Sequence, residues 1–269
     1  MERNLKELEK LARHRDYKIA LANEIIDEMR WGLSAKQQKI LDYMLAEILP
    51  EDTQDKRYSV SIKDYCKEFN IDYRKNSTNY QDIKAAVKTL NNQSRWIDID
   101  KHESVLVQWF RNVKINYDRD TIEYNIDDTI APYLFGLVKT GNYTTHGKRE
   151  IGGFESKYSR PLYILLKRYL EVGITQPILP IGKLKIQLAA EKYDRYPDLR
   201  RFALDMAVKE INELTFMKVS YEGKPQAGSR KIGYVTFEIR WIKPYEDEYA
   251  EREWNNKTVY GERDLLIPI

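Results

Sequence analysis

Apolar residues recur with two different periods along the chain, and the two periods appear in the same order twice. Between residues 34 and 92 three segments repeat apolar residues every three or four positions, as one face of a helix does. Residues 96–126 then alternate apolar with polar residues, as strands do. The same change of period recurs between residues 158 and 241. The pattern therefore predicts two consecutive units, each with helices followed by a β-hairpin.

The first unit begins with three predicted helices. Ser34 is a favourable N-cap for the first, which ends before Pro50, and Ser61 is a favourable N-cap for the second. Cys66 lies on the apolar stripe of the second helix, so we expect it in the core. The third helix has an inner and an outer face: Ile83, Ala86, Val87 and Leu90 are expected inside, and Thr78, Gln81, Lys84, Ala85 and Lys88 outside.

Predicted strands complete the first unit. A short strand at residues 57–60 precedes the second helix, and strands at 96–99, 105–117 and 121–126 follow the third, with residues 118–120 as a hairpin turn. Three helices followed by a β-hairpin is the order of a winged helix. In such helix-turn-helix folds the later helix enters the major groove of DNA, where its outward side chains contact the bases.

The second unit repeats this plan at a constant offset. The run Ala86-Val87-Lys88-Thr89-Leu90-Asn91 reappears 121 residues later as Ala207-Val208-Lys209-Glu210-Ile211-Asn212. Helices are expected to open at Pro161 and Pro197, because proline is tolerated in a first helical turn. A helix at 184–190, a strand at 178–181 and a hairpin of residues 216–221 and 231–241 complete the unit. An offset this long indicates a duplicated domain, since solenoid repeats are about 20–50 residues long.

The outward face of the last helix can be assigned in two ways. The repeat places Leu204, Ala207, Val208 and Ile211 inside and turns Phe202, Asp205 and Lys209 outward. Helical spacing alone also allows a buried stripe of Leu199, Phe202 and Met206. The repeat favours the first assignment, and the alternative in which Phe202 packs in the core stays open.

These patterns predict an α+β chain with two tandem winged helices that are related by internal pseudo-symmetry. They divide the chain into five segments. They are an N-terminal helical arm at 1–30, the first winged helix at 31–138, a linker at 139–153, the second winged helix at 154–243 and an acidic tail at 244–269. The linker has four glycines and few apolar residues. Its residues 141–148 imitate a phosphate-binding loop, but the glycine spacing is wrong and Arg149 replaces the Ser or Thr that binds magnesium. A stripe of Leu5, Leu8, Leu11 and Ala12 in the arm would serve dimerisation or docking on the first domain, and we favour docking.

Composition limits the location and the chemistry. Of the 269 residues 32% are charged, and there is no run of about 18 apolar residues, which a membrane span needs. The charged start lacks the apolar segment of a signal peptide, so we expect a cytoplasmic protein with no membrane partner. One cysteine excludes an internal disulfide and a multi-cysteine zinc site. A net charge of +3 does not by itself indicate a nucleic-acid partner.

No catalytic motif supports an enzyme. A rolling-circle nuclease needs a histidine–hydrophobe–histidine pair near a nucleophilic tyrosine, but His14, His102 and His146 are scattered. The metalloprotease and serine-hydrolase motifs do not occur either. We therefore predict a protein that is not an enzyme and that has no catalytic residue, metal site or cofactor.

Several motifs of the second unit resemble those of a known family. They are Lys157-Tyr158-Ser159, Leu162-Tyr163, Leu165-Leu166-Lys167-Arg168-Tyr169, Tyr196-Pro197-Asp198-Leu199-Arg200-Arg201, Glu210-Ile211-Asn212 and Val219-Ser220-Tyr221. Together they resemble the second winged helix of the iteron-binding plasmid replication initiators, the family of the F and R6K plasmid initiators. Ala22-Asn23-Glu24-Ile25-Ile26 and Leu33-Ser34 are similar to the start of that family's first domain, so the resemblance runs from about residue 23 to residue 240.

The resemblance implies a sequence-specific DNA-binding protein without a cofactor. In this family a monomer binds directly repeated origin sites, the iterons, helps to open the adjacent AT-rich DNA, and recruits the host replication initiator and the replicative helicase. A homodimer, held mainly by the first domain and in equilibrium with the monomer, binds an inverted repeat in its own promoter and represses it. The expected partners are therefore double-stranded DNA, these host proteins and a second copy of the chain.

The resemblance also places the DNA contacts. They are expected on Arg195, Arg200, Arg201, Phe202 and Lys209 in the second domain, and on Thr78, Gln81, Lys84 and Lys88 in the first. Phe202 stands where some relatives have a basic residue, and an apolar contact with a thymine methyl group would suit it. Two recognition helices on one chain suit a site of about 20 bp, because successive major grooves lie about 10 bp apart.

Two other kinds of function stay open from the sequence. A winged-helix transcription regulator would bind promoter DNA without supporting plasmid replication. A winged helix that binds proteins would have no salt-dependent affinity for DNA.

Overall fold

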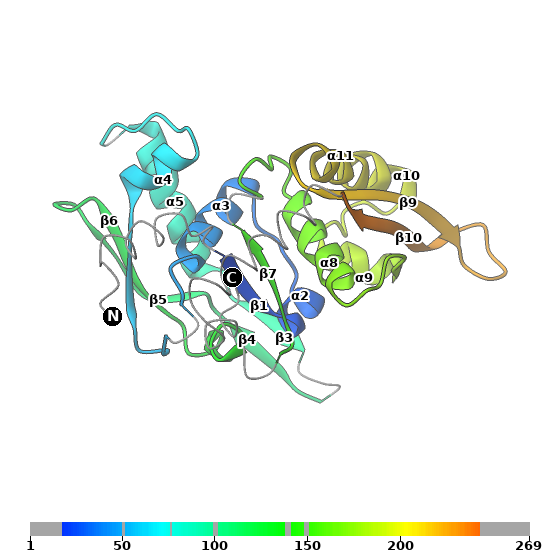
Figure 1. The fold of residues 1–269 in the computed structure, drawn as a ribbon, viewed down its shortest axis with the longest axis horizontal. Coiled ribbons are helices and arrows are strands. Elements are labelled where there is room, and N and C mark those ends of the chain that lie inside the picture. Colours follow the sequence, from blue (N-terminus) through cyan, green and yellow to red (C-terminus); the bar gives the residue numbers. More distant parts are fainter. Residues whose placement is uncertain are drawn as a thin grey trace, which may run out of the picture.

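The fold is known from a computed structural model that describes residues 18–49, 52–75, 77–98, 102–137, 141–147 and 151–242 (Figure 1). The apolar stripe predicted at residues 5–12 and the acidic tail predicted at 244–269 lie outside these ranges. Within them, no helix is long and apolar enough to cross a membrane.

The first winged helix has the predicted order of elements. It consists of α3 (Ala35–Leu45), β2 (Arg57–Ser61), α4 (Ile62–Glu68), α5 (Thr78–Asn92), β5 (Phe110–Asn116) and β6 (Thr121–Ile126). Strand β6 pairs antiparallel with both β2 and β5, which makes a sheet of order β2-β6-β5. The side chains of Ser34, Ser61 and Ser77 accept hydrogen bonds from backbone N–H groups in the first turns of α3, α4 and α5. The caps predicted at Ser34 and Ser61 are confirmed.

The second winged helix repeats the first element by element. It consists of α8 (Ser159–Glu171), β8 (Ile178–Pro180), α9 (Ile181–Gln187), α10 (Tyr196–Leu199), the π-helical turn η2 (Arg200–Leu204), α11 (Asp205–Leu214), β9 (Met217–Pro225) and β10 (Ile232–Trp241). Its sheet has the order β8-β10-β9, which matches β2-β6-β5 strand for strand. Helix α9 begins three residues before the predicted start at Leu184. The duplicated fold inferred from the repeat is confirmed.

The structure differs from the predicted arm and linker. Residues 18–28 of the predicted arm form β1 (Lys18–Ala22) and α2 (Asn23–Glu28), and residues 143–147 of the predicted linker form β7 (Tyr143–Gly147). β1 and β7 pair antiparallel, with Ala20 opposite Thr145. Because each strand takes its hydrogen bonds from a partner more than 100 residues away, neither has a local pattern that identifies it.

Another departure concerns the strands that follow α5. The predicted strand 105–117 is divided into β4 (Ser104–Val107) and β5, and β4 pairs with β3 (Arg95–Asp98) in a hairpin of its own. Strands β5 and β6 alone form the wing of the first domain, with the turn predicted at residues 118–120 between them. A short 3₁₀ turn, η1 (Ala131–Tyr133), follows the wing.

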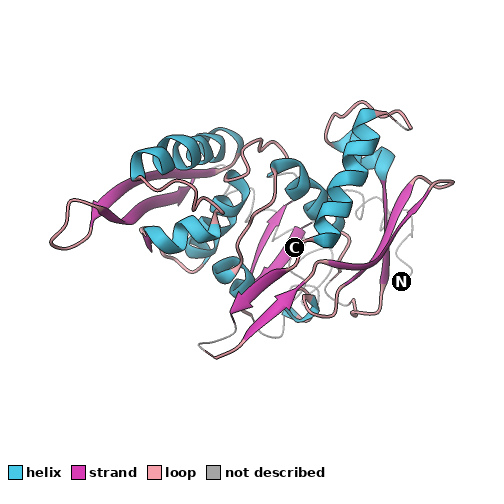
Figure 2. Cartoon of the chain, turned by 180° about the vertical axis from the view of Figure 1, so that it is seen from behind, coloured by secondary structure: helices cyan, strands magenta, loops and turns pink. Residues whose placement is uncertain are grey.

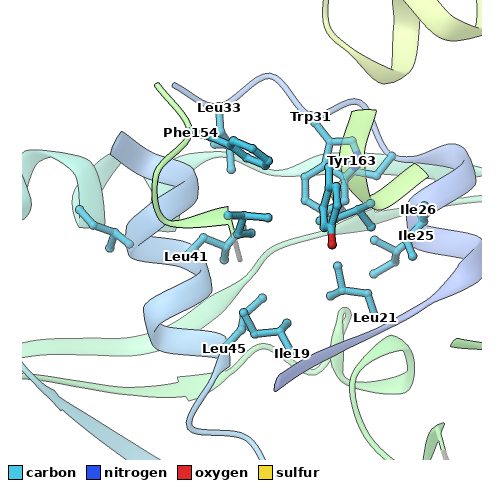
Figure 3. Packing of buried hydrophobic residues seen from close by; sticks show 14 of the residues in the cluster. Ile19, Leu21, Ile25, Ile26, Trp31, Leu33, Leu41, Leu45, Phe154 and Tyr163 are labelled. Carbon is cyan, nitrogen blue, oxygen red and sulfur yellow. The ribbon is translucent and has the colours of Figure 1, made fainter. Parts of the chain in front are cut away.

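One hydrophobic core runs through both domains. Figure 3 shows buried side chains from β1, α2 and α3 meeting Tyr163 of α8, and Leu21, Ile25 and Leu41 among them are fully buried. Cys66 is 1% exposed and belongs to this core, as predicted. Seen from either side, the two wing hairpins lie at opposite ends of the molecule, with α3 and α8 between them (Figures 1 and 2). The two domains are therefore packed directly against each other.

Candidate nucleic-acid interface

The last helix of the second domain has one buried and one exposed face. It runs without a break through α10, η2 and α11. Five side chains on the inner face are 0% exposed: Leu199, Ala203, Leu204, Ala207 and Ile211. Six on the outer face are exposed: Arg200, Arg201, Phe202, Asp205, Met206 and Lys209. The orientation taken from the repeat is thus correct, although Val208 is only half-buried.

Phe202 lies on the surface rather than in the core. Its side chain is 43% exposed, and its ring stacks on Tyr193 with 5.9 Å between ring centroids and 19° between planes. The guanidinium of Arg201 lies 5.2 Å from the Phe202 ring centroid. Met206, one turn further along, is 50% exposed. The outer face therefore presents an apolar strip beside a cation, which suits thymine methyl groups next to phosphate or guanine.

Three of the basic residues predicted to contact DNA carry an acidic neighbour. Arg195 Nε lies 2.9 Å from Asp198 Oδ2, Arg200 Nε lies 3.6 Å from an Asp205 oxygen, and Lys209 Nζ lies 4.0 Å from a Glu213 oxygen. Hydrogen bonding to Asp198 raises the pKa of Arg195 above its usual value. All three pairs are largely exposed, and such pairs are weak, so a DNA phosphate can displace the carboxylate.

Arg201 differs from these three residues because, in the described part of the chain, it has no acidic partner within ion-pair distance. Its side chain is exposed, and its contact is with the Phe202 ring. A guanidinium presents a planar fork of donors that matches two acceptors at once. Arg201 is therefore the residue on this helix that is best placed to bind a guanine edge or a phosphate.

The wing of the second domain adds cations that the sequence did not point to. Strands β9 and β10 are joined by residues 226–231, where Gly228 takes a positive φ of 72° in the turn. Lys224, Arg230 and Lys231 are all exposed around this turn. The available signal was three basic residues flanking a Gly-Ser pair between two alternating segments. Basic residues on a wing can bind the phosphates of the DNA backbone beside the groove that the recognition helix enters.

The recognition helix and the wing of the second domain are joined by tyrosines. The Tyr221 hydroxyl on β9 donates to Asp205 Oδ1 at the start of α11. Burial and the Asp205 carboxylate both raise the pKa of Tyr221, so the phenol stays protonated as a donor. The ring of Tyr196 packs on Gly223, where a Cβ atom would lie 2.6 Å from the tyrosine Cζ. These contacts fix the distance between the helix and the wing.

The corresponding helix of the first domain, α5, exposes most of the predicted contact residues. Thr78, Gln81 and Lys88 are exposed, whereas Lys84 is half-buried. Lys84 Nζ donates to the Tyr117 hydroxyl at 3.2 Å and lies 5.2 Å from its ring centroid. Tyr117 follows β5 at the tip of the wing. Lys84 therefore joins helix to wing in the first domain, as Asp205 does in the second.

No catalytic centre is evident among the described residues. No group of three or more His, Cys, Asp or Glu side chains in these ranges could hold a metal ion. His146 is fully buried in β7, and burial lowers its pKa despite the nearby Asp42.

Comparison with known families fits this geometry. The model of the WH1 domain of initiator replication proteins matches residues 18–167, and the model of the WH2 domain of the same proteins matches residues 183–239. The chain belongs to the initiator replication protein family. The WH1 match of this initiator replication protein begins at β1, includes β7 and extends into α8.

Individual relatives are more distant. The crystal structure of the Pi initiator protein in complex with iteron DNA superposes with a TM-score of 0.70, covering 86% of this chain and 99% of that chain at 20% identity. An uncharacterized 27.6 kDa protein of Escherichia coli is 24% identical over 218 residues, in a match that covers 76% of this chain and 88% of that protein. The first similarity establishes the fold of this initiator replication protein, two winged helices in tandem.

Proposed function

We propose that this chain starts plasmid replication by binding iterons, the direct repeats of a plasmid origin, through both winged helices at once. The observation that carries the proposal is the pair of equivalent helices α5 and α10–α11, each with an exposed polar or basic face beside a wing. Membership of the initiator replication protein family and the likeness to the Pi initiator protein, which was crystallised with iteron DNA, support it.

The contacts in this proposal follow the exposed faces. In the second domain Arg201, Phe202 and Met206 face base edges. The basic residues around them bind phosphates. These are Arg195, Arg200 and Lys209 on the helix, and Lys224, Arg230 and Lys231 on the wing.

In the first domain Thr78 and Gln81 face bases, and Lys88 binds phosphate. Lys84 acts mainly through Tyr117, by holding the wing against the helix.

The regulatory part of the proposal follows from the family. Monomers occupy the iterons, open the adjacent DNA, and recruit the host initiator and replicative helicase in the cytoplasm, where the plasmid is. A dimer, held mainly by the first domain, binds an inverted repeat in its own promoter and lowers expression. The equilibrium between monomer and dimer would couple the copy number of the plasmid to the concentration of the protein.

A footprint on the DNA that flanks the gene tests the proposal. We expect protection of tandem repeats of about 20 bp, with affinity that falls steeply as salt rises, because cations released from the phosphates favour binding at low salt. Protection of a lone promoter site would instead indicate a transcription regulator, and no protection a protein-binding module. Supplying the chain in trans to a plasmid that carries only the protected repeats then tests replication directly, and failure to maintain that plasmid would contradict the initiator role.

A further inference from the structure

The two winged helices meet through a buried ion pair. Arg160, near the start of α8, donates from Nε to Asp42 Oδ2 at 2.6 Å and from Nη2 to Asp42 Oδ1. Both side chains are 2% exposed. Asp42 lies on α3, so the pair joins the first helices of the two repeats. The ion pair therefore links α3 and α8, which are equivalent helices in the two copies of the fold.

The surroundings of the pair favour the charged carboxylate of Asp42 and hold the guanidinium of Arg160 in place. The guanidinium of Arg160 lies 4.6 Å from the ring centroid of Trp31, and His146 Nε2 lies 3.5 Å from Asp42 Oδ1. Burial opposes ionisation of Asp42, but the charge of Arg160 and the contact with His146 outweigh it and hold the pKa of Asp42 below its ordinary value. The joint therefore contains a carboxylate and a guanidinium at neutral pH.

A pair of this kind permits one arrangement of the two helices. Guanidinium and carboxylate groups are planar, and two parallel hydrogen bonds between them fix their relative direction. A shift of either helix would leave two buried charges without partners, which is costly in an apolar interior. Apolar contacts across the joint fix position through close packing, but the hydrophobic effect itself is non-directional, so the ion pair adds a directional constraint.

Further polar contacts across the joint have the same directional character. Gln38 on α3, which is 3% exposed, donates from Nε2 to the Lys157 carbonyl at 2.9 Å. Gln187 of the second domain donates from Nε2 to the Asp27 carbonyl at 2.8 Å, and its backbone carbonyl accepts from the Trp31 backbone N–H at 3.1 Å. Directed bonds of these groups thus join the domains in addition to the ion pair.

We propose that the Asp42–Arg160 pair is a positioning device that sets the distance and rotation between the two recognition helices, and so makes the spacing of the two DNA half-sites a determinant of specificity. This inference rests on the proposed function. Two linked binding modules gain affinity over one only when their geometry matches the sites they bind. A rigid joint therefore rejects a DNA site whose halves are too far apart or out of phase.

A spacing series on DNA tests the inference. Duplexes that the wild-type chain selects from a random pool are altered by inserting about 5 bp between the two protected halves, which rotates one half by about half a turn. We expect the wild-type chain to lose about 100-fold or more in affinity, down to the value for a single half-site. In Asp42→Leu/Arg160→Met, which replaces the pair with apolar side chains, the loss is expected to shrink to less than about tenfold.

Two controls separate the joint from general damage. Lys183→Ala removes an exposed ion pair between the same domains, Lys183 Nζ to Glu28 Oε1 at 2.8 Å, and should leave the spacing penalty at its wild-type value. Affinity of the double variant for a single half-site should also be unchanged, because Asp42 and Arg160 lie away from the DNA-binding faces. A folded double variant that penalises the insertion as strongly as the wild type would overturn the inference.

A measurement without DNA covers the case in which the double variant does not fold. Spin labels on Lys88→Cys and Lys209→Cys, both at exposed positions, report the distance between the two helices. A single narrow distance distribution is expected in the otherwise unchanged chain, and a broader one in Asp42→Asn, where the charge is lost. A broad distribution with the pair intact would overturn the inference. If the wild type bound no tandem repeat while its distribution was narrow, the proposed function would fail and the rigid joint would stand.

Discussion

The two recognition helices occupy equivalent places in a duplicated fold, yet they differ in a regular way. At the 121-residue offset, Lys88 corresponds to Lys209, and both are exposed. Lys84 corresponds to Asp205, and each bonds to a tyrosine of its own wing, although their charges are opposite. Both copies thus have an exposed lysine at one position and, at another, a side chain that bonds to the wing.

Other exposed positions on the same two helices have diverged. Gln81 of α5 corresponds to Phe202, and Ala85 corresponds to Met206, all on exposed faces. A glutamine amide suits the donor and acceptor of adenine, whereas phenylalanine and methionine suit a thymine methyl group. The comparison teaches that the scaffold was copied while the exposed surface of the helix changed. Each direct repeat is therefore expected to contain two different half-sites rather than two copies of one.

The largest effect is expected from Arg201, which has no exposed counterpart in the first domain because the equivalent residue, Tyr80, is 1% exposed. Arg201→Ala should weaken binding to the selected duplex by about 1–3 kcal/mol if the guanidinium contacts a guanine edge. Equilibrium binding by anisotropy measures the loss. Gln81→Ala should cost less, and a larger cost for Gln81→Ala than for Arg201→Ala would contradict the larger contribution expected of Arg201.

A smaller effect is expected from the contact between helix and wing in the second domain. Gly223→Ala places a Cβ atom 2.6 Å from the Tyr196 ring, so the ring must move from its place on the wing, and we expect the start of α10 to shift with it. Affinity should fall about tenfold, or about 1.4 kcal/mol. Gly182→Ala is the matched control, because a Cβ atom there meets no atom within 4 Å. Equal affinities for the two variants would contradict a helix position set by the wing.

The apolar strip of Phe202 and Met206 predicts that binding weakens when a single thymine methyl group is removed from the DNA. Replacing the thymines of one half-site with uracil removes the methyl groups that Phe202 and Met206 would contact, at a cost of about 0.8 kcal/mol for each methyl group buried. The same replacement in the half-site bound by α5 should have no effect. Competition binding with the two substituted duplexes gives the answer, and equal losses in both halves would remove the proposed difference between the helices.

The smallest effects are expected at the positions that the two repeats share. Lys88→Ala and Lys209→Ala should each reduce the slope of log affinity against log salt by about 0.9, because each removes one phosphate contact. Neither should change the order of preference among DNA sequences. A change in sequence preference for either variant would make that lysine a base contact.

Much of the fold was accessible from the sequence because its signals are local. The caps at Ser34 and Ser61 and the prolines at 161 and 197 lie within a few residues of the helices that they begin. The outward face of α11 needed more than periodicity, since helical spacing alone also allowed Met206 inside. Comparison of the two copies resolved it, because the phase of the first helix could be transferred to the second.

The elements that were missed depend on distant partners. Neither β1 nor β7 has a sequence pattern of its own, and each forms because the other is present. Asp42 lies among apolar residues of α3, and nothing near it in sequence indicates that Arg160, 118 residues later, neutralises it. Within the candidate interface, the exposure of single residues was predictable from the helical phase. The tyrosine links to Lys84 and Asp205 were not, because they join segments that meet only in the folded chain.

Binding of an iteron by both domains requires one chain to place two different recognition helices in adjacent major grooves. A DNA-cleaving iron chelate attached at Lys88→Cys in one preparation and at Lys209→Cys in another tests it directly, since Cys66 is buried and only the introduced thiol is available. We expect two cleavage centres about 10 bp apart within each repeat. Coincident centres, or cleavage from one position only, would contradict it.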